Sequence, residues 1–181
     1  MMVWLLIGGG ILLVFALTAF TGAPYVPTKP HDAKKVFTEL YPLSASDVLV
    51  DIGSGDGMVL RAAARCGSRA IGLEINPFLV AVSRLLSRHE PLVSVRLANF
   101  WMISLPDETT VVYTFGESRD ILKMAQKVQR EVTRAGRRIA FISYAFEVPD
   151  LAYAKRTDLH FLYYFEPLQI ENRKYNDKYE S

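Results

Sequence analysis

Short apolar runs alternate with longer amphipathic segments through the middle of this chain. The runs rich in Val, Ile and Leu predict strands at about 48–52, 70–74, 92–97, 110–115 and 138–144. The intervening segments repeat apolar residues at helical spacing and predict helices at about 58–65, 77–88 and 118–134. Strands that alternate with helices are typical of a doubly wound, Rossmann-like α/β fold with a largely parallel sheet.

The pattern changes after Pro149. Residues 151–157 and 159–166 predict two strands with a turn near Asp158, which would form an antiparallel hairpin and close the sheet. We therefore expect a seven-stranded sheet in a domain that spans residues 47–170. The polar residues 171–181 are expected to form a frayed tail.

The N-terminal segment contains no charged side chain from Met2 to Phe20. About 20 apolar residues suffice for a helix that crosses a bilayer core of about 30 Å, so residues 1–23 are predicted to be a transmembrane anchor. A cleaved signal peptide is the alternative, because residues 21–23 (Thr-Gly-Ala) are small, but the chain lacks the positively charged start of such peptides.

Basic residues follow the apolar segment and none precedes it. Lys29, Lys34 and Lys35 lie on its C-terminal side, which predicts a single-pass membrane protein whose domain faces the cytoplasm, or the matrix in a mitochondrion. Residues 24–46 are expected to supply a proline-containing linker and an N-terminal helix at about 30–40. The face of that helix is expected to present Ala33, Val36, Phe37 and Leu40.

Composition narrows the classes of protein and partner. A chain of 181 residues has room for one ordinary domain and a short appendage. Its formal net charge of +2 is too small to argue for a nucleic-acid partner. Cys66 is the only cysteine and the three histidines are dispersed, so we expect neither an intrachain disulfide nor a metal site. The sequence does not indicate an oligomeric state.

A glycine-rich turn follows the first predicted strand, as Asp51-Ile-Gly53-Ser54-Gly55-Asp-Gly57. Glycine admits positive φ and lets a ligand approach the backbone, and the N-terminus of the next helix faces the same turn. A dinucleotide fingerprint would require glycine at the position of Met58. The acidic-x-G-x-G-x-G spacing instead resembles the loop of class I S-adenosylmethionine-dependent methyltransferases.

Glu74 ends the second predicted strand, about 20 positions after the loop, where an acidic side chain can accept hydrogen bonds from ribose hydroxyls. S-adenosylmethionine is thus the expected cofactor. The expected binding residues in this part of the chain are Asp51, Gly53, Ser54, Gly55, Gly57, Glu74 and Asn76. Asn76 is also the expected cap of the helix that begins at Pro77.

A closer resemblance rests on five motifs in one order. They are Tyr25-Val-Pro-Thr28, the glycine loop, Gly72-Leu-Glu-Ile-Asn-Pro77, Asn99-Phe100-Trp101 and Phe115-Gly116. The series resembles the small membrane-anchored lysine methyltransferases that modify the ATP synthase c-subunit and the adenine nucleotide translocase, together with prokaryotic relatives.

This resemblance implies the class I methyltransferase fold and adds residues to the cofactor site. Tyr25 and Thr28 would fold over the cofactor, and Asn99 and Phe100 would lie beside its adenine. Relatives usually carry Asp where this chain has Asn99, but the amide still offers a carbonyl acceptor.

Methyl transfer needs an acceptor held in line with the sulfonium methyl. A lysine acceptor must first lose its proton, which an apolar pocket or a carboxylate favours. Glu117 is the candidate catalytic residue, although it is equally placed to be a solvated helix-cap carboxylate. Trp101 and Tyr144 are the expected walls of the acceptor pocket.

The sequence therefore predicts a protein-lysine N-methyltransferase that acts on a membrane protein. One alternative is methylation of a lipid, a quinone or another small molecule. The other is a cofactor-binding scaffold without catalysis, against which the intact glycine loop and Glu74 argue.

Overall fold

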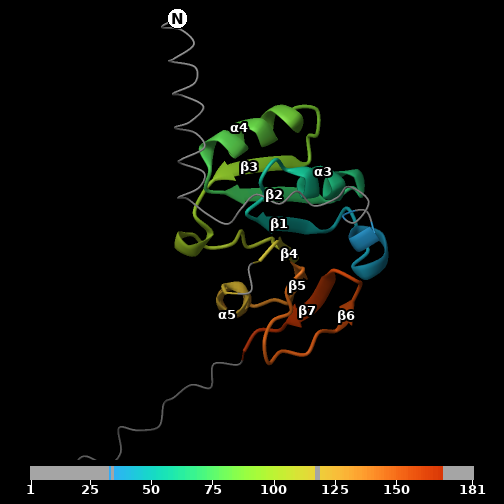
Figure 1. The fold of residues 1–181 in the computed structure, drawn as a ribbon, viewed down its shortest axis with the longest axis vertical. Helices are drawn as coiled ribbons and strands as arrows, with labels where there is room; N and C mark the ends of the chain where they lie inside the picture. Colours follow the sequence, from blue (N-terminus) through green and yellow to red (C-terminus); the bar gives the residue numbers. More distant parts are fainter. Residues whose placement is uncertain (1–32, 34, 117–118, 169–181) are drawn as a thin grey trace, which may run out of the picture.

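A seven-stranded sheet forms the centre of the computed structural model, which describes residues 33, 35–116 and 119–168 (Figure 1). Its strand order is β3-β2-β1-β4-β5-β7-β6. The strands are β1 (Val48–Ile52), β2 (Arg69–Glu74), β3 (Val93–Leu97), β4 (Val111–Thr114), β5 (Ile139–Tyr144), β6 (Lys155–Arg156) and β7 (His160–Phe165). Strands β1 to β5 pair in parallel, and β7 pairs antiparallel with both β5 and β6. The predicted doubly wound α/β sheet is confirmed.

The central strands are apolar runs because both faces of the sheet are covered. Every residue of β1 and β4 is buried, which matches their continuous Val, Leu and Ile content. The chain order reverses between these two neighbours, since β2 and β3 continue on the side of β1 and β5 on the side of β4. Ligands of doubly wound sheets bind at such a switch point, outside the carboxyl ends of the strands.

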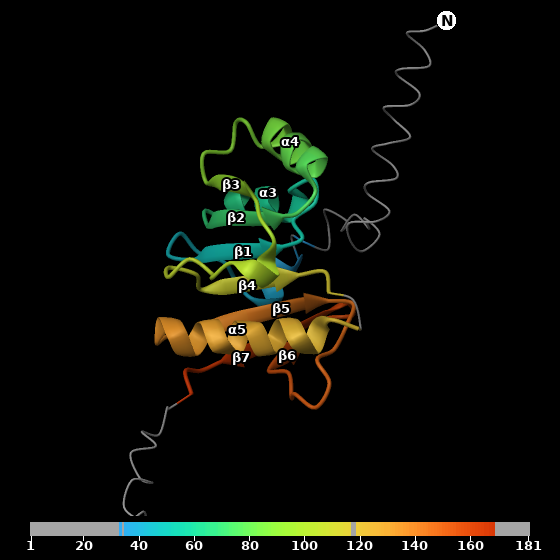
Figure 2. The ribbon, with the colours of Figure 1, turned by 90° about the vertical axis from the view of Figure 1, so that its left-hand side faces the viewer.

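Helices cover the two faces of the sheet. They are α3 (Met58–Arg65), α4 (Pro77–Leu86) and α5 (Ile121–Ala135), with a short π-helical turn η1 (Val36–Leu40) and a 3-10 turn η2 (Phe100–Met102). Helix α5 lies across the β4–β7 half, where its buried residues join one core cluster (Figure 2). Turn η1 and helices α3 and α4 supply the second cluster, which includes the predicted face of Ala33, Val36, Phe37 and Leu40.

The predicted C-terminal hairpin is present, but its first strand is much shorter than residues 151–157. Strand β6 contains only Lys155 and Arg156, which pair with Leu162 and Phe161 of β7. The preceding backbone turns twice through positive φ, at Ala145 and Asp150. Residues 151–153 then take no regular conformation and Ala154 forms a bend, so the strand begins only at Lys155.

The predicted single-pass membrane localisation is contradicted by the structure. Among the described residues, no helix is both long and apolar enough to span a bilayer. Helix α5, the longest of them with 15 residues, carries charged side chains such as Lys123 and Arg130, whereas a span needs about 20 apolar residues. The segment predicted as the anchor, 1–23, lies outside the described residues, as do residues 24–32 of the linker and the tail 171–181.

Candidate active site

The glycine loop connects the carboxyl end of β1 to α3 and is pinned to β2. Gly53, Gly55 and Gly57 have φ of 73°, 54° and 79°, the left-handed conformations that glycine favours. The backbone N–H of Gly53 donates to the carbonyl of Leu73 at 2.8 Å, and that of Ser54 donates to the same oxygen at 3.2 Å. The start of the loop is therefore attached to the end of the neighbouring strand β2, at the switch point.

Gly53 and Gly57 meet different surroundings. A Cβ added at Gly57 would lie 2.1 Å from the Ser83 hydroxyl oxygen of α4, so packing of the two helices excludes a side chain there. A Cβ at Gly53 would have no neighbour within 4 Å. The backbone at Gly53 thus borders open space, as it should where a cofactor approaches the loop closely.

Ser54 turns its side chain beneath the loop. Its hydroxyl oxygen is buried, and a Cβ added at Gly72 of β2 would lie 2.5 Å from it. Within the described part of the chain this hydroxyl has no hydrogen-bond partner. The contribution of Ser54 to the front of the loop is therefore its backbone.

Glu74 joins the glycine loop to the segment after β2. Its side chain is 6% exposed, and its two oxygens accept hydrogen bonds from the backbone N–H of Gly55 at 2.9 Å and of Asn76 at 2.8 Å. Each carboxylate oxygen has a second lone pair, so both can still accept from a ligand hydroxyl. The acid that the sequence predicts at the cofactor is also the residue that shapes the loop.

Asp51 lies on β1, close enough to Glu74 for the two carboxyl groups to interact. It is 3% exposed, and burial, together with the nearby Glu74 and Asp56 carboxylates, raises its pKa well above the usual range. A cation in front of the loop would favour the ionised form of the Asp51 carboxyl. The electrostatics of the site therefore suit a positively charged ligand, and S-adenosylmethionine carries a sulfonium.

Asp56 and Arg61 complete the loop and were not predicted as site residues. The Asp56 carboxylate accepts from the N–H of Met58 at 3.1 Å and pairs with Arg61 Nη2 at 3.2 Å, while Arg61 Nη1 donates to the Asp56 carbonyl at 2.6 Å. An Asp just before a helix is a recognisable N-terminal signal. The arginine, five residues further on, follows only from the folded loop.

The segment after β3 lies against the end of β2, because the N–H of Ala98 donates to the Glu74 carbonyl at 2.9 Å. Asn99 Oδ1 accepts from the N–H of Trp101 at 3.0 Å and so caps η2. One lone pair of the oxygen expected to face the adenine is thereby used, and the Asn99 amide group remains as a donor. Phe100 is buried with its ring 5.2 Å from that of Trp101, which is 44% exposed.

Asn76 is the predicted helix cap: its Oδ1 accepts from the N–H groups of Phe78 and Leu79, and Pro77 opens α4. Its side chain is therefore engaged with the helix. The backbone of Asn76 supports the site instead, through its bond to Glu74.

An aromatic cluster surrounds Tyr144 at the carboxyl end of β5. The Tyr144 ring lies 4.8 Å from the rings of Phe115 and His160, and Tyr113 Oη lies 3.0 Å from His160 Nε2. His160 was not predicted at the site, because only the pairing of β7 with β5 brings it opposite Tyr144. Trp101 follows β3 and Tyr144 ends β5, so the two predicted pocket walls lie on opposite sides of the switch point.

Three predicted site residues, Tyr25, Thr28 and Glu117, lie outside the described residues. In the part of the chain that the structure does describe, no group of three His, Cys, Asp or Glu side chains could hold a metal ion.

A cavity of about 340 Å³ opens at the opposite, amino edge of the sheet. It is lined by Tyr41, Asp47, Thr110, Arg138, Ala140 and Tyr164. Burial opposes ionisation of Asp47, but hydrogen bonds from Ser44, Thr110 and Tyr41 outweigh it and lower the pKa of the carboxyl. This polar network is satisfied within the fold and is remote from the carboxyl ends of the strands, where a cofactor binds.

A family model for the ANTKMT methyltransferase domain matches residues 51–155, which begin at the acid of the glycine loop. The chain belongs to this family. Among curated relatives, it is 32% identical to the ATP synthase c-subunit lysine N-methyltransferase of Xenopus laevis, over 87% of this chain and 74% of that protein. The human protein of the same name is 33% identical, over 75% of this chain and 61% of its own length. The mouse adenine nucleotide translocase lysine N-methyltransferase is 35% identical over 46% of this chain and 38% of its own.

Solved methyltransferase structures share the fold of this chain. The RNA methyltransferase of Salinibacter ruber in complex with S-adenosylhomocysteine superposes with a TM-score of 0.70 at 27% identity, and covers 81% of this chain and 97% of its own. A methyltransferase from Geobacter sulfurreducens, also with S-adenosylhomocysteine, shares the fold with a TM-score of 0.55 at 18% identity, over 76% of this chain and 58% of its own. This ANTKMT-family chain is a class I methyltransferase, and S-adenosylmethionine is its cofactor.

Proposed function

We propose that this chain transfers the methyl group of S-adenosylmethionine to the ε-amino group of a protein lysine. The observation that carries the proposal is the likeness to curated lysine N-methyltransferases, named for the ATP synthase c-subunit and the adenine nucleotide translocase. The chain matches only 61% of the length of the human relative, and the identity of the acceptor is therefore proposed together with the reaction. Both named acceptors are membrane proteins, and the ATP synthase c-subunit is the first one to test.

The cofactor roles proposed for individual residues follow the loop geometry. The backbone from Gly53 to Gly57 would border the sulfonium and ribose, and Glu74 would accept from the ribose hydroxyls while it keeps its bonds to Gly55 and Asn76. Asp51 would balance the positive charge from behind the loop. When bound, S-adenosylmethionine supplies an electrophilic methyl group.

The adenine would lie against the segment that follows β3. Phe100 offers a buried ring at this point, and the amide of Asn99 is the polar group left free by the cap of η2. Tyr25 and Thr28 remain candidates for a cover over the cofactor.

The acceptor lysine would enter between Trp101 and the cluster around Tyr144. An apolar, aromatic pocket disfavours the charged ammonium and so lowers the pKa of a lysine within it. A carboxylate near the end of β4 would assist the loss of the proton, and Glu117 remains the candidate for that role.

The experiment separates the classes of acceptor. The full chain is incubated with methyl-labelled S-adenosylmethionine and a cell extract, which is then divided into protein, RNA and lipid. We expect label in the protein fraction, as methyl-lysine after hydrolysis. Label confined to lipid or to RNA, the acceptor class in the name of the Salinibacter ruber structure, would refute the proposal.

A further inference from the structure

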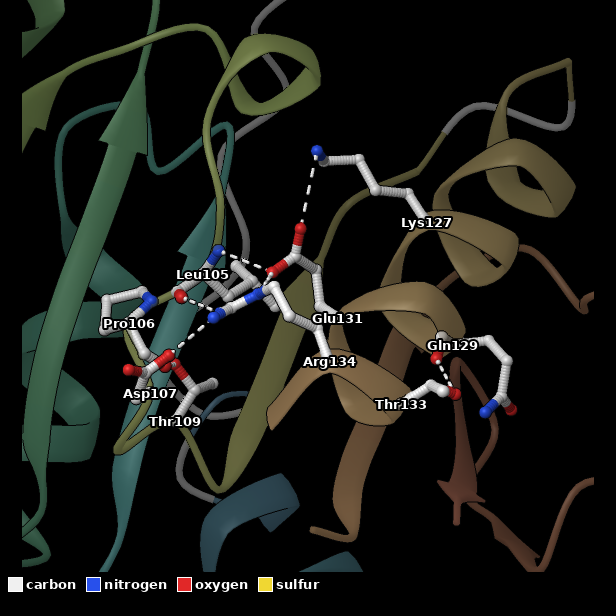
Figure 3. Close-up of polar contacts among 9 residues, drawn as sticks. All are labelled: Leu105, Pro106, Asp107, Thr109, Lys127, Gln129, Glu131, Thr133 and Arg134. Atoms are coloured by element: carbon white, nitrogen blue, oxygen red, sulfur yellow. Dashed lines mark hydrogen bonds and ion pairs between the residues drawn. The ribbon is translucent and has the colours of Figure 1, made fainter. Parts of the chain in front are cut away.

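Helix α5 is fastened to the segment between β3 and β4, residues 98–110, through one buried acid (Figure 3). Glu131 is 7% exposed, and its Oε2 accepts from the backbone N–H of Leu105 at 3.1 Å. The same oxygen accepts from Arg134 Nε at 2.9 Å. The Glu131–Arg134 ion pair therefore does more than stabilise the helix surface, because it also binds the backbone of the loop at Leu105.

Arg134 extends the attachment to both sides of Pro106. Its Nη2 donates to the carbonyl of Leu105 at 2.8 Å, and its Nη1 pairs with Asp107 Oδ1 at 2.7 Å. One guanidinium therefore binds the helix acid, a loop carbonyl and a loop carboxylate, as Figure 3 shows. Only the planar fork of arginine can satisfy three such acceptors together.

Lys127 makes a further contact one turn earlier on α5. Its ammonium lies 5.2 Å from the centre of the Phe100 ring and 3.8 Å from Glu131 Oε1. The side chains of Lys127 and Glu131 are both nearly buried. The acid thus faces two cations, and through them it reaches both the start and the end of the segment.

The segment held in this way begins at the cofactor site. Ala98 bonds to Glu74, Asn99 caps η2, and Phe100 packs under Lys127. In the described part of the segment, residues 103–110 form no helix or strand that would fix their path. The ends of the segment are bonded to strands β2 and β1, and the contacts from α5 hold Phe100 and the irregular residues Leu105 and Asp107 between them.

We propose that Glu131 and Arg134 are positioning residues for cofactor binding, which hold residues 98–110 so that Phe100 and Trp101 form a preformed wall beside the adenine. The inference rests on the proposed function in one respect, the adenine side of the site. Helix α5 contributes no predicted cofactor ligand, yet by this inference it controls the affinity for S-adenosylmethionine.

The test replaces the guanidinium of Arg134 by an ammonium, which keeps the positive charge but not the planar set of donors. Arg134→Lys in the full chain retains a cation near Glu131 but cannot reach Leu105 and Asp107 at the same time. The matched control is Arg130→Lys, an exposed residue one turn earlier on the same helix. We expect Arg134→Lys to weaken S-adenosylhomocysteine binding about tenfold and to raise the KM for S-adenosylmethionine by about the same factor. The kcat should change by less than about twofold.

A spectroscopic readout reports the segment itself. The chain has two tryptophans, Trp4 and Trp101, so a Trp4→Phe background leaves one reporter. In that background we expect Arg134→Lys to increase acrylamide quenching of Trp101, and Arg130→Lys to leave it unchanged. A purely structural role would lower the melting temperature and the amount of active enzyme without a selective change in KM.

Phe100→Ala distinguishes the proposed adenine contact of Phe100 from the proposed positioning role of Arg134. If it weakens S-adenosylhomocysteine binding while Arg134→Lys alters neither the affinity nor the Trp101 quenching, the positioning role is wrong and the adenine wall stands. If Phe100→Ala leaves the affinity unchanged, the proposed adenine side fails, and the positioning of the cofactor wall fails with it.

Discussion

At the scale of single residues, the glycine loop shows how one residue type meets two separate demands. Gly53 and Gly57 have nearly the same left-handed backbone, yet one faces open space and the other faces Ser83. The sequence predicts the positive φ at both positions from their spacing after a buried strand. It cannot tell which glycine serves packing, because Ser83 comes from another helix.

Alanine at these two positions should separate strain from packing. Gly53→Ala is expected to cost about 1–2 kcal/mol of stability through the left-handed backbone alone. Gly57→Ala adds the clash with Ser83, worth about 1–3 kcal/mol more. Urea denaturation measures the difference, and equal losses in the two variants would show that the Ser83 contact is not constraining.

The buried Asp51 carboxyl predicts a pH dependence of stability. Its pKa is raised in the folded chain, so between about pH 4, the unfolded value, and the folded value the native state holds more protons than the unfolded one. The free energy of unfolding therefore falls as pH rises through that window. Asp47 has a lowered pKa in the folded chain, so the stability that it contributes is lost only as pH falls below about 4.

Asp51→Asn cannot ionise and should flatten this slope, so that the variant is at least as stable as the parent at neutral pH. Urea denaturation from about pH 5 to about pH 8 measures it. Parallel pH profiles for the two proteins would contradict the assignment of the raised pKa to Asp51.

At the scale of elements, local signals decided most of what the sequence predicted correctly. Helix α3 has the expected bounds, 58–65, and Asn76 with Pro77 opens α4 as expected. The cap and the glycine turn act within a few residues, so spacing along the chain reveals them. The short β6 and the attachment of Leu105 to Glu131 depend on contacts between residues 5 to 26 positions apart, which no local pattern encodes.

The cap of α4 can be tested alone. Asn76→Ala removes the acceptor for the N–H groups of Phe78 and Leu79 and should cost about 1 kcal/mol of stability. Asn76→Asp keeps the acceptor and places a negative charge at the helix N-terminus, so it should match or exceed the parent. Thermal unfolding distinguishes them, and an Asn76→Ala variant as stable as the parent would refute the capping role.

At the scale of the whole molecule, the switch point between β1 and β4 divides the proposed site. The β1–β3 half carries the glycine loop, Glu74 and the segment with Phe100, while the β4–β7 half carries the cluster around Tyr144. The glycine turn and the cap at Asn76 could be predicted from the sequence because their motifs are contiguous. In the other half, the place of His160 beside Tyr144 follows only from strand pairing, which no contiguous motif reveals.

A variant of Glu74 and a matched control test whether the geometry of the glycine loop is needed for catalysis. Glu74→Gln can accept only one of the two backbone N–H groups that the carboxylate now binds, and it removes the charge beside the ribose. Glu39→Gln, at an exposed position of η1, makes the same chemical change away from the site.

The most direct test of the proposed function is mass spectrometry of the purified ATP synthase c-subunit after incubation with the full chain and S-adenosylmethionine. We expect methyl groups on a lysine ε-amine with the parent and with Glu39→Gln, and little or none with Glu74→Gln. If neither the c-subunit nor the adenine nucleotide translocase is modified, or if Glu74→Gln methylates as well as the parent, the proposed function is contradicted.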